Sequence, residues 1–387
     1  MQLLRQRRAV VSKGLRTKDK MIKLFKQLFS SNKNQESNTY EDFWKWFSSK
    51  EKIFFQIVKD EQDIENNFFN YLTPKLENIS EDLFFMTGML NEEVAELILT
   101  ADGNVRKFYI IEELVQSAPK LENWKFTAHK PELDIKNVGI RMGDLEFNSE
   151  NQFFTTNNLE NYPDEIDLTI IHSDYTDENS KNITIGCYIF LDNYLGEMNF
   201  ASTIDNISIN SKSEGSNELI PIYKLKDYLN WRQKEFIEKY EDIIYKNEKD
   251  EHSIFEFKLS DKKVIIAVIN TDLLKWENKV SHPWILSIKI GYDSPEEKNG
   301  MPTKESMEQL EIIEDEITSF LTPNNGQIYL GRQTGNHERS IFWVCKDFRK
   351  PSKILDDIIK KYKNSFSIEF DVYKDKYWKS FNSFVKY

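Results

Sequence analysis

Apolar side chains recur along this chain at two spacings, every second residue and every three or four residues. Between residues 284 and 373 these spacings follow the order strand, helix, strand, strand, helix, strand. The run at 284–290 alternates and is rich in β-branched residues, whereas 304–320 repeats apolar side chains at helical spacing. Gly335-Asn336 falls between the two central strands and predicts a hairpin turn.

The order βαββαβ is that of the ferredoxin-like arrangement, which we predict for the C-terminal domain. A similar succession of helix, strand, strand, helix and strand occupies residues 62–130. This internal repeat predicts a second ferredoxin-like α+β unit in the N-terminal half, preceded by an aromatic helix at 40–58. Pro74 lies inside the predicted helix at 62–79 and is expected to kink it or to end it early.

The stretch between the two repeats is predicted to be a β-rich extension. Segments that alternate or run apolar lie at 139–147, 151–156, 166–173 and 182–190, with a closing strand at 204–210. A long amphipathic helix is predicted at 224–246. The predicted fold class is therefore α+β.

A charged run without apolar anchors at 246–253 marks the predicted domain boundary. The chain then divides into a basic leader with a polar linker (1–39), an N-terminal α+β domain (40–248) and a C-terminal domain (249–387). Residues 1–26 hold nine Lys or Arg and one acid. We interpret the leader as unstructured, or as an over-extended start before a true initiator at Met21. A basic arm for nucleic acid or acidic lipid is the alternative.

Charge and composition exclude or disfavour several classes of function. The formal net charge is −12, and beyond residue 26 there are 43 Lys or Arg against 63 Asp or Glu, which disfavours nucleic-acid binding. Cys187 and Cys345 lie in apolar runs and are predicted to be buried free thiols in a reducing, cytoplasmic compartment. No apolar run predicts a membrane span, and no secretory signal is recognised. The five histidines lack metal-ligand spacing, so neither a metal nor a cofactor is predicted.

Several short motifs in the C-terminal third occur in a fixed order. They are Pro283-Trp284, Asn299-Gly300-Met301-Pro302, Leu310 with Glu314-Asp315, Gly331-Arg332, Thr334-Gly335, Arg339 with Phe342, and Phe370-Asp371-Val372. In this order they resemble the uncharacterised family called domain of unknown function 695, over roughly residues 254–380. The resemblance implies no known activity, and residues 35–250 resemble no family that we can name.

The segment 331–339 is the most suggestive for binding. One interpretation is ordinary turn chemistry at a solvated hairpin tip. The other is an anion or carboxylate site in which Arg332 and Arg339 donate bidentate hydrogen bonds. No catalytic residue is nominated. The candidate binding residues are Arg332, Thr334, Asn336, His337, Arg339, Tyr329, Trp343 and Tyr373.

The predicted sheet has one face toward its helices and one open face. Leu286, Ile288 and Ile290 are expected to point inward, with Tyr329, Trp343 and Tyr373 exposed. Acids on the terminal strand, beside Lys289, make this face unsuited to RNA.

We therefore predict a non-enzymatic interaction or regulatory protein that binds another protein through the open face. The alternatives are a hydrolase or small-molecule-binding enzyme with a site between the two halves, using Arg332, Arg339 and acids such as Asp293, and an immunity or antitoxin-like protein whose acidic body neutralises a basic toxin. The oligomeric state is not predicted.

Overall fold

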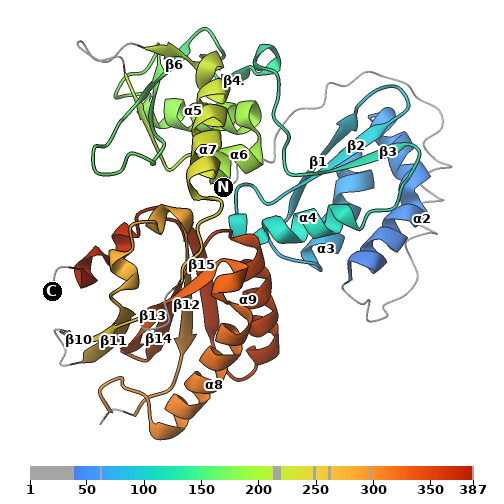
Figure 1. The fold of residues 1–387 in the computed structure, drawn as a ribbon. Coiled ribbons are helices and arrows are strands. Elements are labelled where there is room, and N and C mark those ends of the chain that lie inside the picture. Colours follow the sequence, from blue (N-terminus) through green and yellow to red (C-terminus); the bar gives the residue numbers. More distant parts are fainter. Residues whose placement is uncertain are drawn as a thin grey trace. The chain divides into compact units, whose positions relative to one another are not determined.

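The computed structural model describes residues 39–61, 63–211, 219–246, 250–259, 263–295 and 298–385, and the predicted leader lies almost wholly outside these ranges. The fold is mixed α+β with several sheets, as the sequence predicts (Figure 1). Contacts divide the chain into two compact units. Unit 1 comprises the described residues up to Ile98 with Leu114–Thr127, and unit 2 comprises Leu99–Glu113 with the described residues from Ala128 onward. The domain boundaries drawn from the sequence stay a prediction. No helix in the described ranges is both long and apolar enough to cross a membrane.

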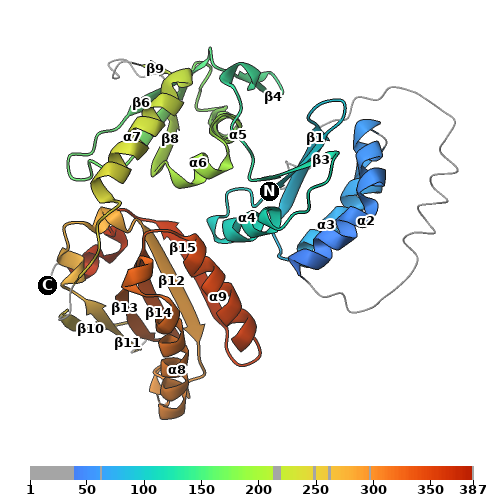
Figure 2. The same cartoon turned by 45° about the vertical axis from the view of Figure 1, so that its right-hand side comes forward.

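Unit 1 is a three-stranded sheet with helices on one side (Figure 2). Its core is aromatic, because Phe47 of the first helix packs edge-on against Trp124 and Phe126 of the last strand, with ring centroids 5.1 and 5.4 Å apart. The elements are α2 (Tyr40–Lys59), a π-helical turn (Glu65–Phe69), α3 (Asn70–Glu77), β1 (Phe84–Met89), β2 (Ala95–Thr100) and β3 (Trp124–Ala128), with α4 (Phe108–Gln116) running into both units. The sheet order is β1-β2-β3.

Helix α3 continues through Pro74 and ends at Glu77. The π-helical turn precedes it, and Asn70 N donates to Glu65 O five residues earlier. Pro74 has no N–H with which to complete the helical ladder, but the helix ends only three residues after it, close to the predicted end at residue 79.

The middle of the chain forms a four-stranded sheet in the order β8-β7-β6-β9 and a separate two-stranded pair, β4-β5. β7 and β8 run parallel, and the connection between them contains two helices. The elements are β4 (Ile140–Met142), β5 (Leu145–Phe147), β6 (Gln152–Thr156), β7 (Asp167–His172), α5 (Ser180–Leu195), α6 (Glu197–Ser202), β8 (Asn206–Asn210), β9 (Ile220–Pro221) and α7 (Leu225–Tyr240).

The strand predicted at 182–190 is wrong, because these residues belong to helix α5. β-branched residues and a central glycine made the segment look like a strand. Its buried side chains nevertheless fall at helical spacing, at Ile183, Cys187, Phe190 and Leu191. The need for a crossover between parallel strands outweighs the local β propensity. Both Cys187 and Cys345 are buried and free, which confirms that prediction.

The C-terminal part of unit 2 is a six-stranded antiparallel sheet in the order β10-β11-β13-β14-β12-β15 (Figure 1). Its elements are β10 (His252–Lys258), β11 (Val264–Asn270), β12 (Trp284–Gly291), α8 (Lys304–Phe320), β13 (Gln327–Gly335), β14 (Glu338–Cys345), α9 (Arg349–Tyr362) and β15 (Ile368–Lys374). Leu286, Ile288 and Ile290 of β12 are fully buried, as predicted.

The face predicted to be open is partly covered. A short 3₁₀ segment at the end of the chain (Lys379–Phe384) packs there. Trp378, Phe381 and Phe384 form one buried cluster with Ile285, Val344 and other sheet residues. The residues that cover this face follow the last strand. The sequence pattern did not predict that their aromatic side chains would pack on the sheet.

We expect Gly186→Ala to destabilise the protein by about 1–3 kcal/mol, although alanine normally favours a helix interior over glycine. A Cβ at residue 186 would overlap the ring of Phe147. The control is Gly88→Ala, where a Cβ would meet no atom within 4 Å. Urea denaturation of both variants measures the difference. A neutral or stabilising Gly186→Ala would show that Phe147 does not pack against α5 as described.

Candidate functional site

Two of the predicted arginines converge on one carboxylate, that of Glu314 in α8. Arg332 Nη1 and Arg339 Nη1 each donate to Glu314 Oε2 at 2.9 Å. Tyr329 Oη donates to Oε1 of the same carboxylate at 2.8 Å, and Arg339 Nε donates to Thr334 Oγ1 at 3.1 Å. Strands β13 and β14 therefore direct three of the predicted residues at helix α8, and Thr334 holds the guanidinium of Arg339 from the side.

The degree of burial indicates what this cluster does. The side chains of Arg339 and Glu314 are 1% and 8% exposed, whereas that of Arg332 is 31% exposed. Burial lowers the pKa of Arg339. Burial also acts to lower the pKa of Arg332, but the charge and hydrogen bond of Glu314, together with nearby Tyr329 and Glu311, outweigh burial and raise that pKa. The carboxylate partner expected for these arginines is thus the protein's own Glu314, which fastens α8 to the sheet. Ligand binding by these residues stays a prediction.

Asn336 and His337 form the tip of the β13–β14 hairpin. Both have positive φ, 52° and 66°, as a tight two-residue turn requires. His337 N and Tyr292 Oη each donate to Gly300 O at 2.9 Å. A Cβ on Gly300 would lie 2.9 Å from Asn336 Cα, so glycine permits the close approach of the two loops. These contacts hold the Asn-Gly loop against the hairpin.

The predicted aromatic surface is wrong, because Tyr329, Trp343 and Tyr373 do not share an exposed face. Trp343 is completely buried beside Tyr329, with ring centroids 5.1 Å apart. Trp343 pairs with the inward-facing Leu286, and cross-strand neighbours share a face of the sheet. Tyr373 lies opposite Ile285 and packs against the cluster on the other face. The register therefore excludes the expected grouping.

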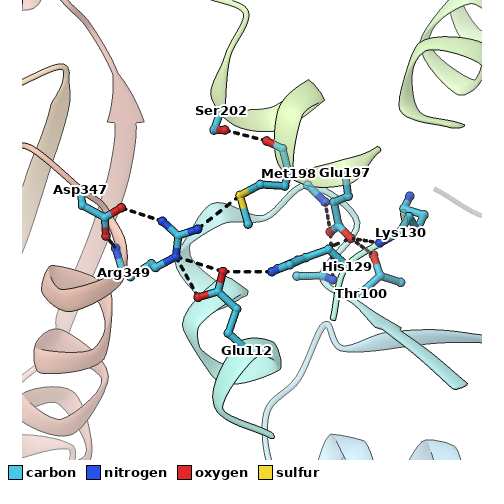
Figure 3. Close-up of polar contacts among 11 residues, drawn as sticks. Thr100, Glu112, His129, Lys130, Glu197, Met198, Ser202, Asp347 and Arg349 are labelled. Carbon is cyan, nitrogen blue, oxygen red and sulfur yellow. Dashed lines mark hydrogen bonds and ion pairs between the residues drawn. The ribbon is translucent and has the colours of Figure 1, made fainter. Parts of the chain in front are cut away.

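A second buried cluster, which the sequence analysis missed, surrounds Glu197 at the start of α6 (Figure 3). Thr100 Oγ1 donates to Glu197 Oε2 at 2.6 Å, and the backbone N–H groups of Ala101, Gly103 and Lys130 donate at 2.9–3.1 Å. Burial alone would raise the pKa of Glu197. These donors, together with the nearby His129, outweigh burial and hold the pKa at about 2. Glu197 therefore stays ionised inside the protein.

His129 extends this cluster toward Glu112 (Figure 3). Its Nδ1 lies 3.8 Å from Glu197 Oε2, and its Nε2 lies 3.3 Å from Glu112 Oε1. Glu112 accepts from Arg349 Nε at 2.8 Å, and Arg349 Nη1 donates to Asp347 Oδ2 at 2.6 Å. Acidic and basic groups thus alternate along a line that joins α6, α4 and the start of α9 within unit 2.

This line of polar contacts holds neighbouring segments of unit 2 together. Each carboxylate has a basic neighbour, and Glu197 binds the loop after β2 through its backbone N–H groups. We call it the Glu197 clamp. The signal for Glu197 in the sequence was weak, because acids are common in the first turn of any helix. The glycine before it is needed only in the folded chain, where Gly196 has φ of 76° and an added Cβ would lie 2.8 Å from Glu132 N. Within the described ranges, no group of three or more His, Cys, Asp or Glu is placed to hold a metal ion.

A third cluster joins the loop before β7 and the loop before β8 to the segment that follows β15. Asp205 accepts from Lys374 Nζ at 2.8 Å and from Lys376 Nζ at 2.7 Å. Burial lowers the pKa of Lys374 to about 8, and the charge of Asp205 opposes that shift. Asp164 accepts from Tyr377 Oη at 2.8 Å. These contacts also serve to fix segments of unit 2.

The exposed apolar residues of unit 1 differ from all three clusters. On strand β1, Phe84 and Met86 are 48% and 43% exposed, and Leu90 follows at 52%. Phe84 and Met86 are two residues apart, so they lie on the same side of the strand. Phe85, on the opposite side, packs against Phe68 and Phe69 beneath the sheet. β1 therefore presents an apolar row away from its own helices.

An open hollow of about 370 Å³ lies in unit 2 between residues 244–246 and 272–276. Its lining is mixed, with Ile244 and Trp276 beside Lys246, Asp272 and Lys275. The predicted binding residues do not line it.

We expect Glu314→Gln to destabilise the protein by about 3–5 kcal/mol, because it leaves Arg339 buried without its counter-charge. Glu316→Gln is the control on the same helix. It removes ion pairing with Lys361 at a more exposed position and is expected to cost less than about 1 kcal/mol. Urea denaturation compares the two variants. Equal losses would contradict the role given to Glu314.

Acid should weaken the Glu197 clamp. Because the folded-state pKa of about 2 lies below the ordinary 4.5, its contribution is complete above pH 4.5 and is lost as pH falls toward 2. We expect the stability difference between wild type and Glu197→Gln to shrink by about 2 kcal/mol between pH 6 and pH 3. Denaturation at both pH values measures it. A constant difference would show that the carboxylate is not held ionised.

Comparison with known proteins gives one match. No curated protein and no solved structure matches the chain. A family model matches the C-terminal part of the chain, over a segment that includes strands β11 to β15 and the cluster of Glu314, Arg332 and Arg339. Residues 253–385 match the model of a family of unknown function, DUF695, as the motifs in the sequence indicate.

Proposed function

We propose that this protein is a non-enzymatic, protein-binding regulatory module whose binding surface is the exposed side of strand β1. The observation that carries the proposal is the row of Phe84 and Met86, each nearly half exposed on the same side of one strand. Contiguous exposed apolar surface marks interaction sites, whereas isolated apolar residues are normal on any protein.

Other exposed apolar side chains in the described ranges are more scattered. Ile312 and Phe320 are eight residues apart on α8, and Glu316 between them is engaged by Lys361 and Tyr362. Trp231 lies on α7 beside Arg232, whose guanidinium stacks over its ring. Along β1, by contrast, residues two apart are only about 7 Å apart. This spacing favours β1 as the surface that a partner covers.

Charge supports a basic partner. The described residues of unit 1 contain 14 Asp or Glu against seven Lys, a net charge of −7, whereas residues 1–38 contain ten Lys or Arg against two acids. The acidic surface proposed here is that of the described residues alone. An acidic surface steers a basic protein toward it and speeds association. The same property supports the immunity or antitoxin-like version of this function, in which the partner is a basic toxin.

The C-terminal fold and the cellular location predicted from the sequence are also proposals. The C-terminal βαββαβ segment is proposed to be a ferredoxin-like scaffold, supported by the order β13-β14-β12-β15 and its two helices. A cytoplasmic location is proposed and is supported by the two free thiols. The enzyme alternative has less support. Arg332 and Arg339 are engaged by Glu314, whereas Asp293 is exposed in the loop after β12.

The test is capture of a partner from the native host at endogenous expression, with Met86→Glu as the variant. We expect wild type to recover one stoichiometric protein and Met86→Glu to lose it, because a charge replaces an apolar contact residue. Ile312→Glu is the matched control, since Ile312 is 62% exposed on α8, and it should retain the partner.

Thermal unfolding confirms that both variants are folded. Recovery of the partner by Met86→Glu, or its loss from Ile312→Glu alone, would contradict the proposed surface. Background proteins only, from wild type, would contradict the function itself.

A further inference from the structure

We infer that the partner binds as an extended strand that pairs with the outer edge of β1 and carries basic residues on both sides of an alternating apolar core. This inference rests on the proposed function and names the chemistry of the partner segment. Three observations support it: the position of β1 in the sheet, the direction of its N–H groups, and the charges at its two ends.

Strand β1 is the outermost strand on its side of the three-stranded sheet, within the residues that the structure describes. An edge strand displays backbone donors and acceptors that another strand can pair with. Proteins often protect such edges with lysine or proline. β1 reads FFMTGM and contains neither. It is therefore an unprotected edge.

The hydrogen bond that closes the β1–β2 hairpin shows which amides face outward. Leu90 N donates to Val94 O at 2.8 Å, so the N–H of Leu90 points toward β2. Amides of a strand alternate in direction, so those of Gly88, Met86 and Phe84 also point toward β2. The N–H groups of Thr87 and its alternate neighbours then point away from the sheet. A partner strand would find its donors there.

Acidic residues lie at both ends of β1. Glu81 and Asp82 precede the strand, and Glu92 and Glu93 follow it in the turn, all of them exposed. Between these pairs the exposed side chains of the strand are apolar. An extended segment with Lys or Arg at each end and apolar side chains at alternate positions between them complements this arrangement. An acidic segment would meet like charges at both ends.

Gly88 adds room for the partner's side chains. A Cβ at this position would meet no atom within 4 Å, so the exposed side of the strand is open there. A large apolar side chain of the paired strand can lie over this glycine, beside Met86. The acidic ends, the apolar row and the space at Gly88 therefore specify a strand with basic ends and bulky alternate residues.

The probe is a fluorescent peptide, Lys-Lys-Val-Thr-Val-Thr-Val-Lys-Lys, titrated against the full chain and followed by fluorescence anisotropy. Thr87→Pro removes the outward N–H and is tolerated at a free edge, whereas Thr87→Val keeps that N–H. Both lose the bond that Thr87 Oγ1 donates to Glu96 O, so Thr87→Val is the matched control.

We expect Thr87→Pro to weaken peptide binding about tenfold or more and Thr87→Val to change it less than about twofold. The same peptide with Glu in place of each Lys should bind at least about tenfold more weakly than the basic peptide. Circular dichroism confirms that the variants are folded.

Equal binding by Thr87→Pro and Thr87→Val, equal binding of the basic and acidic peptides, or no binding of the basic peptide would overturn the inference. The proposed function is tested separately by partner capture. If Met86→Glu loses the captured partner while Thr87→Pro retains it, β1 is a binding surface but strand pairing is not the mode.

Discussion

A β-sheet has two faces, and the constraint on which this structure depends is how the face without helices is covered. Helices pack on one side of a sheet and bury its apolar residues, but the other side must be covered by something else or face water. In the C-terminal sheet the end of the chain supplies Trp378, Phe381 and Phe384 as that cover. In unit 1 the outer strand keeps Phe84 and Met86 exposed. The difference between these two sheets directs attention to β1 as the binding surface.

Buried charges hold the helices and loops in place. Glu314 gathers two arginines and a tyrosine, so α8 is fixed to β13 and β14 by charge-assisted hydrogen bonds as well as by apolar packing. Glu197 does the same for the loop after β2, through the backbone amides of Ala101 and Gly103, and for the segment after β3, through that of Lys130. Arg332 and Arg339, which looked like ligand-binding groups, are thus hydrogen-bonded to a carboxylate of the protein itself, and the cluster attaches a helix to the sheet.

The sequence predicted the C-terminal helices and strands well because their hydrophobic periods were long and regular. The inward residues of β12, the hairpin before Glu338 and both flanking helices follow from spacing alone. The middle region was harder, since Ile183 and its β-branched neighbours favour a strand and only the parallel pairing of β7 with β8 explains the helix.

The positions of the candidate residues could be predicted only in part. Arg332 and Arg339 do converge, but their partner Glu314 comes from a helix, and spacing along a sequence does not reveal which elements meet. Trp343 was misplaced because its face depends on its register with Leu286. The exposure of β1 could not be predicted from the sequence either, since FFMTGM has no polar alternation that would mark one face as solvated.

Hydrogen–deuterium exchange on the full chain, with and without its captured partner, tests the central claim most directly. The exchange rate of each segment reports whether its amides become hydrogen-bonded or covered on binding. We expect the partner to slow exchange most strongly in the segment containing Phe84–Met89. Unchanged exchange in β1, with slowing confined to another surface such as α8, would contradict it.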